Sequence, residues 1–443
     1  MTDQSHERTV MLSLISEQAI PNVMAALLVE PRPTTMICLL PKDRESPGKP
    51  DREFERIGSG IKAAFDALVE STQGEIDLHV QRLGPVSPYN FEEVRGACER
   101  IRMESLAQGY TVVYNVTGGT KLMALAALRD AEEGNCRAVY IDTEFRRLVE
   151  VSPEPGKREF IEERLRPLDV PHYLAAYGLG QEVKGRQDIP KCFREAARLL
   201  ALNPEPGTAV LRHILAQQGQ QDEPYNLSLV GLDLDARHVL EQAVDWLGDD
   251  RAAISGNTLE LLVDDDMYDF WWNRRWLEWY VFDVLEKMSR SADERRYNPP
   301  WCDVRFAWEA DYARAMEEIL FVEDESGQRI RLPLNELDIA AVRCGRLLVC
   351  ECKTGGNALQ SEHFYKLSVV GRRLGTFADK VFVTDVPGLA NPACRDASTR
   401  RQALRALILD VAVVGLEELP VLVDVLADPD GRLRQQKHWF GLR

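Results

Sequence analysis

Several common features are missing from this sequence, and each absence excludes a class of protein. No run of about 18 apolar residues is present, so the sequence predicts no membrane-spanning helix. The nine cysteines are scattered and contain neither a CxxC pair nor the spacing of a zinc site, which predicts buried, reduced thiols. The first residues, MTDQSHERTV, are polar and lack the apolar core of a signal peptide, which predicts a cytoplasmic protein.

The balance of charge argues against a protein that coats nucleic acid without specificity. The 443 residues carry a formal net charge of −17, which repels a phosphate backbone. The acidity is uneven, because residues 331–443 hold 16 Lys and Arg against 13 Asp and Glu. A local basic site therefore stays open in the last quarter of the chain. The length favours two or three globular domains.

The first 150 residues alternate between two periodicities. Short apolar runs typical of buried strands are followed by segments whose apolar residues recur at helical spacing. The predicted strands are TVMLSLI, TTMICLL, EIDLHV, YTVVYNV and CRAVYID. The predicted helices contain NVMAALLVE, GSGIKAAFDALVE, NFEEVRGACERIRME and TKLMALAALRDAEEG. This alternation predicts a parallel, doubly wound sheet, and we assign residues 1–165 to a Rossmann-like domain.

Two further regions complete the predicted α/β fold. Residues 166–256 are predicted to form a mostly helical connecting region, in which NPEPG and GQQDEP are loops. A winged-helix element within this region stays open. Residues 257–443 are predicted to form a second α/β unit, which begins with the strand TLELLVDDD. The main elements of this unit run helix, strand, strand, helix, strand.

A loop in the N-terminal domain has the composition of a phosphate site. NVTGGTKLM, residues 115–123, joins the fourth predicted strand to a helix, and ligands of open α/β sheets bind at the carboxyl ends of strands. The helix N-terminus offers N–H groups to a phosphate, and Thr117, Thr120 and Lys121 add hydroxyls and charge. Neither GxxxxGK[ST] nor GxGxxG is matched, which argues against ATP hydrolysis and NAD binding. The alternative is a tight turn with a solvated lysine.

A second polar loop favours a pocket over a simple turn. SEQAIPN, residues 16–22, follows the first predicted strand and presents Ser16, Gln18 and Asn22 at the same edge of the sheet. Neutral donors and acceptors beside a phosphate cradle suit a nucleotide base or ribose. The two loops together therefore predict a nucleotide-like ligand.

The stretch LNELDIAAVRCGRLLVCECKTGG, residues 334–356, places charge inside two apolar strands. Glu351 and Lys353 are two residues apart and so face the same side of a strand, and a hairpin would bring Asp338 beside Glu351. A buried carboxylate is costly unless it is paired or bound to metal. Two oxygen ligands suit Mg²⁺ or Mn²⁺, and Lys353 would orient water or stabilise charge on a phosphate. The alternative is a structural ion-pair network.

A predicted helix supplies a third carboxylate. Glu278 lies in RRWLEWYVF, where on its own it also fits a solvated helix face. Together, in the order helix-Glu, strand-Asp, strand-ExK, these positions argue against a purely structural ion-pair network. The candidate metal ligands are Asp338, Glu351 and Glu278, and the candidate catalytic residues are these three and Lys353.

These residues resemble those of a known family. Asp338 with Glu351, Cys352 and Lys353 resembles the signature of the PD-(D/E)XK nuclease fold, and WLE at residues 276–278 resembles the helix that often precedes it. SEQAIPN and NVTGGTKLMALAA resemble the two ligand-loop motifs of CARF domains, the Rossmann-like sensors of CRISPR defence. The combination is similar to the CRISPR ancillary nuclease family of type III systems. Two departures are LD in place of PD, and WWNRRWLE in place of the glycines that usually open the helix.

The resemblance implies a fold, a ligand and an activity. It implies a CARF-like domain followed by a restriction-endonuclease-like domain over residues 257–443. It further implies a homodimer that binds cyclic oligoadenylate, usually the tetramer, and then cuts DNA or RNA with Mn²⁺ or Mg²⁺. By resemblance, the residues that line the ring pocket would be Ser16, Gln18, Asn22, Thr117, Gly118, Gly119, Thr120 and Lys121.

Two other functions stay open at this point. A ligand-sensing regulator would bind DNA through the middle helices and carry a degenerate nuclease fold. The intact set of Asp338, Glu351 and Lys353 favours an enzyme over this regulator. A ring nuclease would degrade its own activator, but the two loops offer no obvious catalytic acid or base.

Overall fold

The computed structural model describes most of the chain. It covers residues 8–442 apart from 44–47, 144–146, 154–157, 160–161, 166, 179–188, 218–224, 249, 263, 291–302, 310–320, 324–328, 332–335, 344, 356 and 376–377. The predicted loop GQQDEP lies outside the described residues. Among the helices that are described, none has the length and apolar character needed to cross a membrane.

The N-terminal unit is a seven-stranded sheet with the order β3-β2-β1-β4-β5-β6-β7. The strands are β1 (Thr9–Leu14), β2 (Thr35–Pro41), β3 (His79–Val86), β4 (Thr111–Asn115), β5 (Arg137–Asp142), β6 (Arg147–Ser152) and β7 (Arg158–Glu159). The first five strands pair in parallel, as predicted, and β6 and β7 add an antiparallel edge that was not predicted. The third strand begins only at His79 and continues past the predicted segment.

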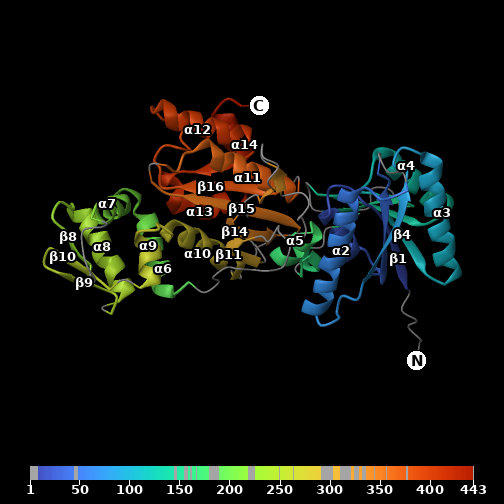
Figure 1. The fold of residues 1–443 in the computed structure, drawn as a ribbon, viewed down its shortest axis with the longest axis horizontal. Coiled ribbons are helices and arrows are strands. Elements are labelled where there is room, and N and C mark those ends of the chain that lie inside the picture. Colours follow the sequence, from blue (N-terminus) through green and yellow to red (C-terminus); the bar gives the residue numbers. More distant parts are fainter. Residues whose placement is uncertain are drawn as a thin grey trace.

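Helices cover both faces of this sheet, which makes it doubly wound (Figure 1). The helices are α1 (Ile20–Leu28), α2 (Arg52–Ser71), α3 (Phe91–Ala107), α4 (Lys121–Glu133), the short 3₁₀ helix η1 (Glu162–Leu165) and α5 (Val170–Ala176). One apolar core joins the sheet to α1, α2 and α5, and a separate core joins the other face to α3 and α4. The chain leaves β1 and β4, which are neighbours in the sheet, toward opposite faces. The loops after these two strands therefore border the switch point where open α/β sheets bind ligands.

The middle unit is a small helical bundle with its own sheet. Its elements are α6 (Lys191–Leu202), α7 (Pro204–Leu215), β8 (Tyr225–Ser228), α8 (Leu234–Leu247), β9 (Ala252–Ser255) and β10 (Thr258–Leu261). The strands are antiparallel in the order β8-β10-β9. Three helices against a three-stranded antiparallel sheet form a winged-helix arrangement, the possibility that the sequence left open.

Two sequence predictions in this region are wrong. NPEPG is not a loop, because α7 begins at Pro204. The first turn of a helix leaves its N–H groups unpaired, so prolines are tolerated there at no cost in hydrogen bonds. The strand TLEL does not open the C-terminal unit either, because Thr258–Leu261 pairs with β8 and β9. Its partner strands precede it in the chain by at most about 35 residues, and strand periodicity does not reveal which strands will pair.

The C-terminal unit is built on a five-stranded mixed sheet with the order β11-β14-β15-β16-β17. Its strands are β11 (Asp303–Glu309), β14 (Glu336–Arg343), β15 (Arg346–Lys353), β16 (Asp379–Thr384) and β17 (Ala412–Val414). A separate two-stranded sheet consists of β12 (Phe321–Glu323) and β13 (Arg329–Arg331). The helices are α9 (Asp265–Trp271), α10 (Trp276–Arg290), α11 (Ser361–Arg373), α12 (Ala397–Ile408), the 3₁₀ helix η2 (Leu416–Val421), α13 (Leu422–Ala427) and α14 (Pro429–Trp439).

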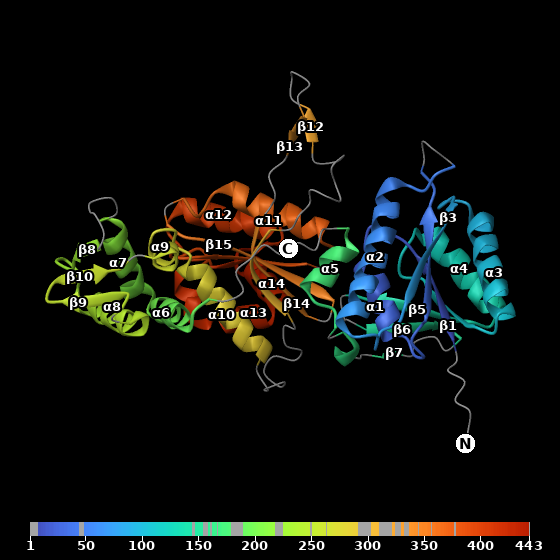
Figure 2. The ribbon, with the colours of Figure 1, turned by 60° about the horizontal axis from the view of Figure 1, so that its bottom comes forward.

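The C-terminal unit lies between the other two in space, although it comes last in sequence (Figures 1 and 2). The face of its sheet that packs on α11 and α12 shares one apolar core with α1 and α5 of the N-terminal unit. The opposite face, covered by α10 and α13, shares a second core with the middle unit. Each face of the central sheet is therefore packed continuously against a different neighbour.

The buried side chain of Gln436 on α14 completes the edge of the central sheet. Its Oε1 atom accepts from the Val413 N–H at 3.0 Å, and its Nε2 atom donates to the Val413 carbonyl at 2.6 Å. Because β17 is an edge strand, these two bonds replace the pairing that a further strand would provide.

We predict that Gln436→Leu lowers the free energy of unfolding of the C-terminal unit by about 2 kcal/mol, because both polar groups of Val413 would be left buried without partners. The urea midpoint of unfolding measures this. Gln435→Leu, at the exposed neighbouring position, should change the midpoint little. Equal midpoints for the two variants would contradict the edge-pairing role.

Candidate functional site

The β14–β15 hairpin brings the predicted carboxylates together. The strands are antiparallel, and Ile339 lies opposite Cys350, so Asp338 lies opposite Glu351. Both side chains are buried, with exposed fractions of 5% for Asp338 and 2% for Glu351. The prediction of a hairpin with charge on one face is confirmed.

Lys353 joins the two carboxylates into one cluster. Its Nζ atom lies 3.1 Å from Asp338 Oδ2 and 2.9 Å from Glu351 Oε1. Asp338 Oδ2 also accepts from the Cys352 N–H at 2.7 Å, which fixes the carboxylate against the next strand. Burial alone disfavours the ammonium, but the charges of Asp338 and Glu351 raise the pKa of Lys353 above its usual range. The lysine is therefore positively charged in the cluster.

Glu351 is held in an environment that disfavours its charge. Burial, followed by the neighbouring charge of Asp338, raises the pKa of Glu351, and Lys353 and Lys366 oppose this rise only in part. Such a carboxylate gains from a divalent cation nearby, because the cation supplies the missing positive charge. The oxygen donors of Asp338 and Glu351 fit Mg²⁺ or Mn²⁺ in their chemistry.

Helix α11 contributes two residues that sequence reasoning missed. Lys366 Nζ lies 3.5 Å from Glu351 Oε1, so a second cation faces the cluster. His363, one turn earlier, has a pKa lowered by burial and by the nearby charge of Lys353, which keeps its ring neutral. The only sequence signal was the spacing of the two residues, which places both on one face of a helix.

The structure does not bring Glu278 into this cluster. Glu278 lies in the first turn of α10, and its Oε2 atom is 3.7 Å from the Arg275 guanidinium. Helix α10 packs on the face of the sheet that carries Cys350 and Cys352, opposite to the face of Glu351. In the part of the chain that the structure describes, no three His, Cys, Asp or Glu residues are grouped closely enough to hold a metal ion. Asp338 and Glu351 are thus neighbours on the hairpin, and Glu278 as a third ligand stays a prediction.

Asp385 and Arg274 form a second charged group, which was not predicted from the sequence and which contacts the loop after β15. Asp385 follows β16 and accepts from the Gly355 N–H at 2.8 Å. Burial raises the pKa of Asp385, and this N–H and the charge of Arg274 oppose the rise. Arg274 adopts a left-handed conformation (φ +59°) and lies 3.5 Å from the Thr354 carbonyl. Arg274, which stands where the resembling family usually has glycines, therefore contacts the loop that follows β15.

The N-terminal unit holds a pocket of about 540 Å³ at its switch point. The two predicted loops line one side of it through Ser16, Gln18, Gly119 and Thr120. The other side comes from residues that sequence reasoning missed, because they follow different strands: Pro41, Lys42, Asp51, Glu53, Phe54, Pro88 and Tyr89. The volume is in the range of small-molecule sites.

The remaining predicted ligand residues build the loops instead of lining the pocket. Asn22 is fully buried, and its Oδ1 atom accepts from Asn115 Nδ2 at 2.9 Å. Thr117 donates to Asn115 Oδ1 at 2.6 Å and accepts from the Ile141 N–H at 2.8 Å. Lys121 is exposed at the start of α4. Asn115, a buried residue at the end of β4, thus ties the two loops together.

The two glycines are required by close packing and by backbone conformation. A Cβ atom on Gly118 would lie 2.0 Å from the Leu14 carbonyl oxygen, and Gly119 has a φ of +72°. Thr120 then caps α4 by accepting from the Met123 N–H at 3.2 Å, while its hydroxyl donates to the Pro88 carbonyl at 2.7 Å. The loop after β4 is thereby held directly against the end of β1.

Comparison with known proteins assigns the C-terminal unit. Residues 269–431 match the model of the family described as Card1-like, endonuclease domain. No match was found among curated protein sequences. The matched segment is thus similar to a Card1-like endonuclease domain, and the charged β14–β15 hairpin lies inside it.

Two solved structures share the fold of almost the whole chain. Protein VC1899 from Vibrio cholerae has a TM-score of 0.68 at 16% identity, over 96% of this chain and 98% of that one. Can2 from Sulfobacillus thermosulfidooxidans, solved with cyclic tetra-adenylate, has a TM-score of 0.63 at 21% identity, over 95% and 97%. The predicted fold, a Rossmann-like N-terminal sheet joined to a C-terminal α/β unit, is confirmed. The resemblance of the C-terminal unit to an endonuclease agrees with the family match over residues 269–431.

The pKa of Glu351 generates a prediction on stability. Because this pKa is raised on folding, the ionised side chain opposes folding, and the effect grows as the pH rises through the folded pKa. We predict that Glu351→Gln raises the unfolding temperature of the metal-free protein at pH 7. The gain should shrink below about pH 4, where the glutamate is neutral in both states.

Thermal unfolding at several pH values measures this difference. Glu362→Gln, at an exposed position in the first turn of α11, is the matched control and should not raise the unfolding temperature. A lower unfolding temperature for Glu351→Gln at pH 7 would contradict the inference that the ionised Glu351 side chain opposes folding.

Proposed function

We propose that the chain is a divalent-metal-dependent endonuclease that a cyclic oligoadenylate activates, as part of type III CRISPR antiviral defence. The observation that carries this proposal is the buried cluster of Asp338, Glu351 and Lys353 within a Card1-like endonuclease domain. The N-terminal pocket supports the ligand, because it lies at the switch point of a fold shared with a protein solved with cyclic tetra-adenylate. The substrate would be DNA, single-stranded RNA or both.

Asp338 and Glu351 would hold the divalent cation, Mn²⁺ or Mg²⁺, on the face of the hairpin that also carries Lys353. A bound cation supplies a water of lowered pKa and neutralises charge on a phosphodiester. Lys353 keeps its proton in this environment and offers a fixed positive charge to the scissile phosphate. The Cys352 N–H holds Asp338 in place. Glu278, in the first turn of α10, would be the third carboxylate.

The pocket offers distinct contacts to the parts of a nucleotide ring. The N-terminus of α4 at Gly119 and Thr120 provides N–H groups to a phosphate. Lys42 also lines the pocket, where it pairs with Glu93. The rings of Tyr89 and Phe54 provide stacking surfaces for an adenine base. The carboxylates that also line the pocket belong to α2 and to the loop after β1, so we place the phosphates on the α4 side. Ser16 and Gln18 remain for the base or the ribose.

We further propose a homodimer in which each protomer contacts half of the ring. A two-fold axis matches a ring with an even number of nucleotides, since both halves then make the same contacts. The ring would be the tetramer.

The charge of the middle unit argues against the alternative of a DNA-binding regulator. Helix α8 of the winged-helix arrangement holds Asp235, Glu241 and Asp245 against Arg237 and His238. A helix that enters a DNA groove needs an excess of positive charge. The acidic α8 therefore favours a structural role for this unit.

The first test is cutting of supercoiled plasmid and single-stranded RNA with Mn²⁺, with and without cyclic tetra-adenylate. We predict cutting only when both the metal and the ring are present, and loss of cutting by at least 100-fold in Glu351→Ala, on the order of the effect of removing one stabilising group from a catalytic site. Ring binding by Glu351→Ala should be unchanged. Ring binding without any cutting by the wild type would favour the regulator.

The ligand pocket is tested separately by Gly118→Ala. The new methyl group would meet the Leu14 carbonyl, so the loop after β4 must shift and ring affinity should fall at least tenfold. Gly96→Ala on α3 is the matched control, because no atom lies within 4 Å of its added Cβ. Calorimetric titration with cyclic tetra-adenylate measures both. Equal affinity for the two variants would move the ring away from this loop.

A further inference from the structure

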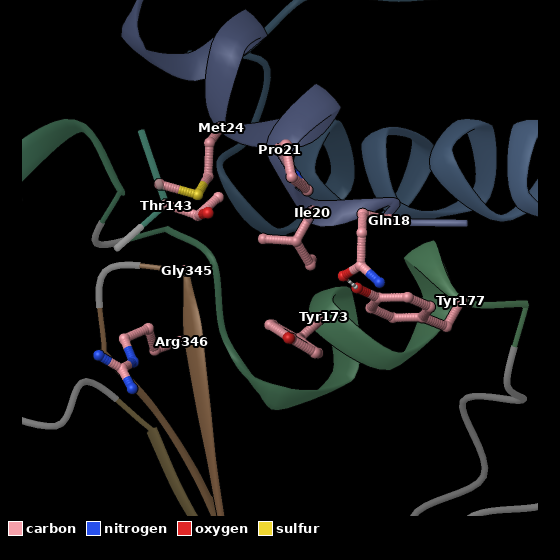
Figure 3. A pocket seen from close by; sticks show the side chains of 9 residues that line it. All are labelled: Gln18, Ile20, Pro21, Met24, Thr143, Tyr173, Tyr177, Gly345 and Arg346. Atoms are coloured by element: carbon pink, nitrogen blue, oxygen red, sulfur yellow. Dashed lines mark hydrogen bonds between the residues drawn. The ribbon is translucent and has the colours of Figure 1, made fainter. Parts of the chain in front are cut away.

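The loop after β1 contacts the C-terminal unit through two tyrosines at the end of α5. Gln18 Oε1 lies 3.4 Å from the Tyr177 hydroxyl, and the ring centroids of Tyr173 and Tyr177 are 5.6 Å apart. The Tyr173 hydroxyl donates to the Leu374 carbonyl at 2.9 Å. Figure 3 shows Gln18 and Tyr177 facing each other beside Tyr173. A residue that lines the ligand pocket is thus two side chains from the nuclease fold.

This contact is closely packed. A Cβ atom on Gly375 would lie 2.6 Å from the Tyr177 hydroxyl, 3.0 Å from the Tyr173 hydroxyl and 3.4 Å from Gln18 Oε1. The cavity between the two units here is only about 10 Å³, roughly the space of one water molecule. Movement of Gln18 toward the two tyrosines is therefore not absorbed by empty space and must displace its neighbours.

Helix α11 connects this contact to the catalytic cluster. Leu374 follows directly after the helix, and Lys366 lies eight residues earlier, or about 12 Å along the helix axis. Lys366 faces Glu351 at 3.5 Å. A shift of the helix end at Leu374 is transmitted to Lys366, because a helix packed on a sheet moves as a unit.

The catalytic hairpin meets the same part of the N-terminal unit by a second route. A Cβ atom on Gly345, in the turn between β14 and β15, would lie 2.6 Å from the sulfur of Met24 on α1. Arg346, which lines the same small cavity, pairs with Asp379 at 2.5 Å and so ties the start of β15 to β16. Helix α1 begins at Ile20, two residues after Gln18. Both elements that build the catalytic cluster therefore contact the segment that follows β1.

We propose that the contact of Gln18, Tyr177 and Tyr173 with Leu374 couples the ligand pocket to the catalytic cluster, by setting the position of α11 and Lys366. This inference rests on the proposed function and names the regulation of the same site. A cyclic oligoadenylate that binds the Gln18 amide changes the partner of Tyr177, and the ring favours one position of α11 over another. The contiguous chain of packed side chains supplies the physical connection.

The experiment uses the full-length protein and measures the cutting rate with and without cyclic tetra-adenylate. Tyr173→Phe removes only the hydroxyl that bonds to Leu374, and we expect the ratio of the two rates to fall about fivefold or more. Tyr177→Phe should give a similar fall. The ratio detects a loss of coupling whether the variant is more active without the ring or less active with it.

Tyr114→Phe is the matched control. Its hydroxyl is also buried and hydrogen-bonded, to Asp130 Oδ2 at 2.6 Å, but it lies in the core under α3 and α4, away from the contact. This variant should lower the unfolding temperature and leave the ratio of rates unchanged. A change that came from general destabilisation would appear equally in Tyr114→Phe and Tyr173→Phe, and would overturn the proposal.

The remaining outcomes separate this inference from the proposed function. If the wild type is activated by the ring and Tyr173→Phe and Tyr177→Phe are activated to the same extent, the coupling through Leu374 is wrong and the proposed function stands. If the wild type cuts equally with and without the ring, the proposed function fails and the coupling fails with it. Retained ring binding by Tyr173→Phe together with a reduced ratio supports the coupling.

Discussion

The burial of two carboxylates side by side on one β-hairpin is the constraint on which the rest of the structure depends. Asp338 and Glu351 are both nearly inaccessible to water, and burial, followed by the charge of Asp338, raises the pKa of Glu351. Lys353 and Lys366 offset this charge from two different elements, β15 and α11. The fold must therefore hold a strand and a helix in register within a few ångströms, which requires that both faces of the sheet be packed.

The central position of the nuclease sheet meets this requirement and also links the site to the rest of the chain. One face shares its core with α1 and α5 and the other with the winged-helix unit, so neither face is open to water. The same packing leaves the ends of α11 and of the β14–β15 hairpin in contact with the segment after β1. Stability of the site and its connection to the ligand pocket therefore come from the same apolar interfaces.

The sequence predicted those parts of the fold that depend on local periodicity. The alternation of apolar runs identified β1 to β5, and the spacing of Glu351 and Lys353 identified the charged face of β15. Features that depend on tertiary packing could not be predicted from the sequence. Periodicity does not tell which face of a sheet a helix covers, so it gave no reason to separate Glu278 from Glu351 or to add Lys366. The predicted loop at NPEPG is instead the start of α7 at Pro204, because a proline in the first turn of a helix costs no hydrogen bond.

The ligand loops show a related limit on what residue type alone can reveal. Asn22 and Thr117 have the polar groups of ligand-binding residues, but both direct them to Asn115 and the backbone, where they hold the two loops at a fixed separation. A pocket at the end of buried strands needs such internal bonds, because unpaired polar groups there would cost stability. The other side chains that line the pocket, such as Lys42 and Tyr89, follow other strands. Gln18 is different from both groups, because it lines the pocket and also contacts Tyr177. The sequence motifs therefore predict where the pocket lies, because they contain the residues that hold its loops in place. The residues that line the rest of the pocket come from loops after other strands, and these are identified only from the topology of the sheet.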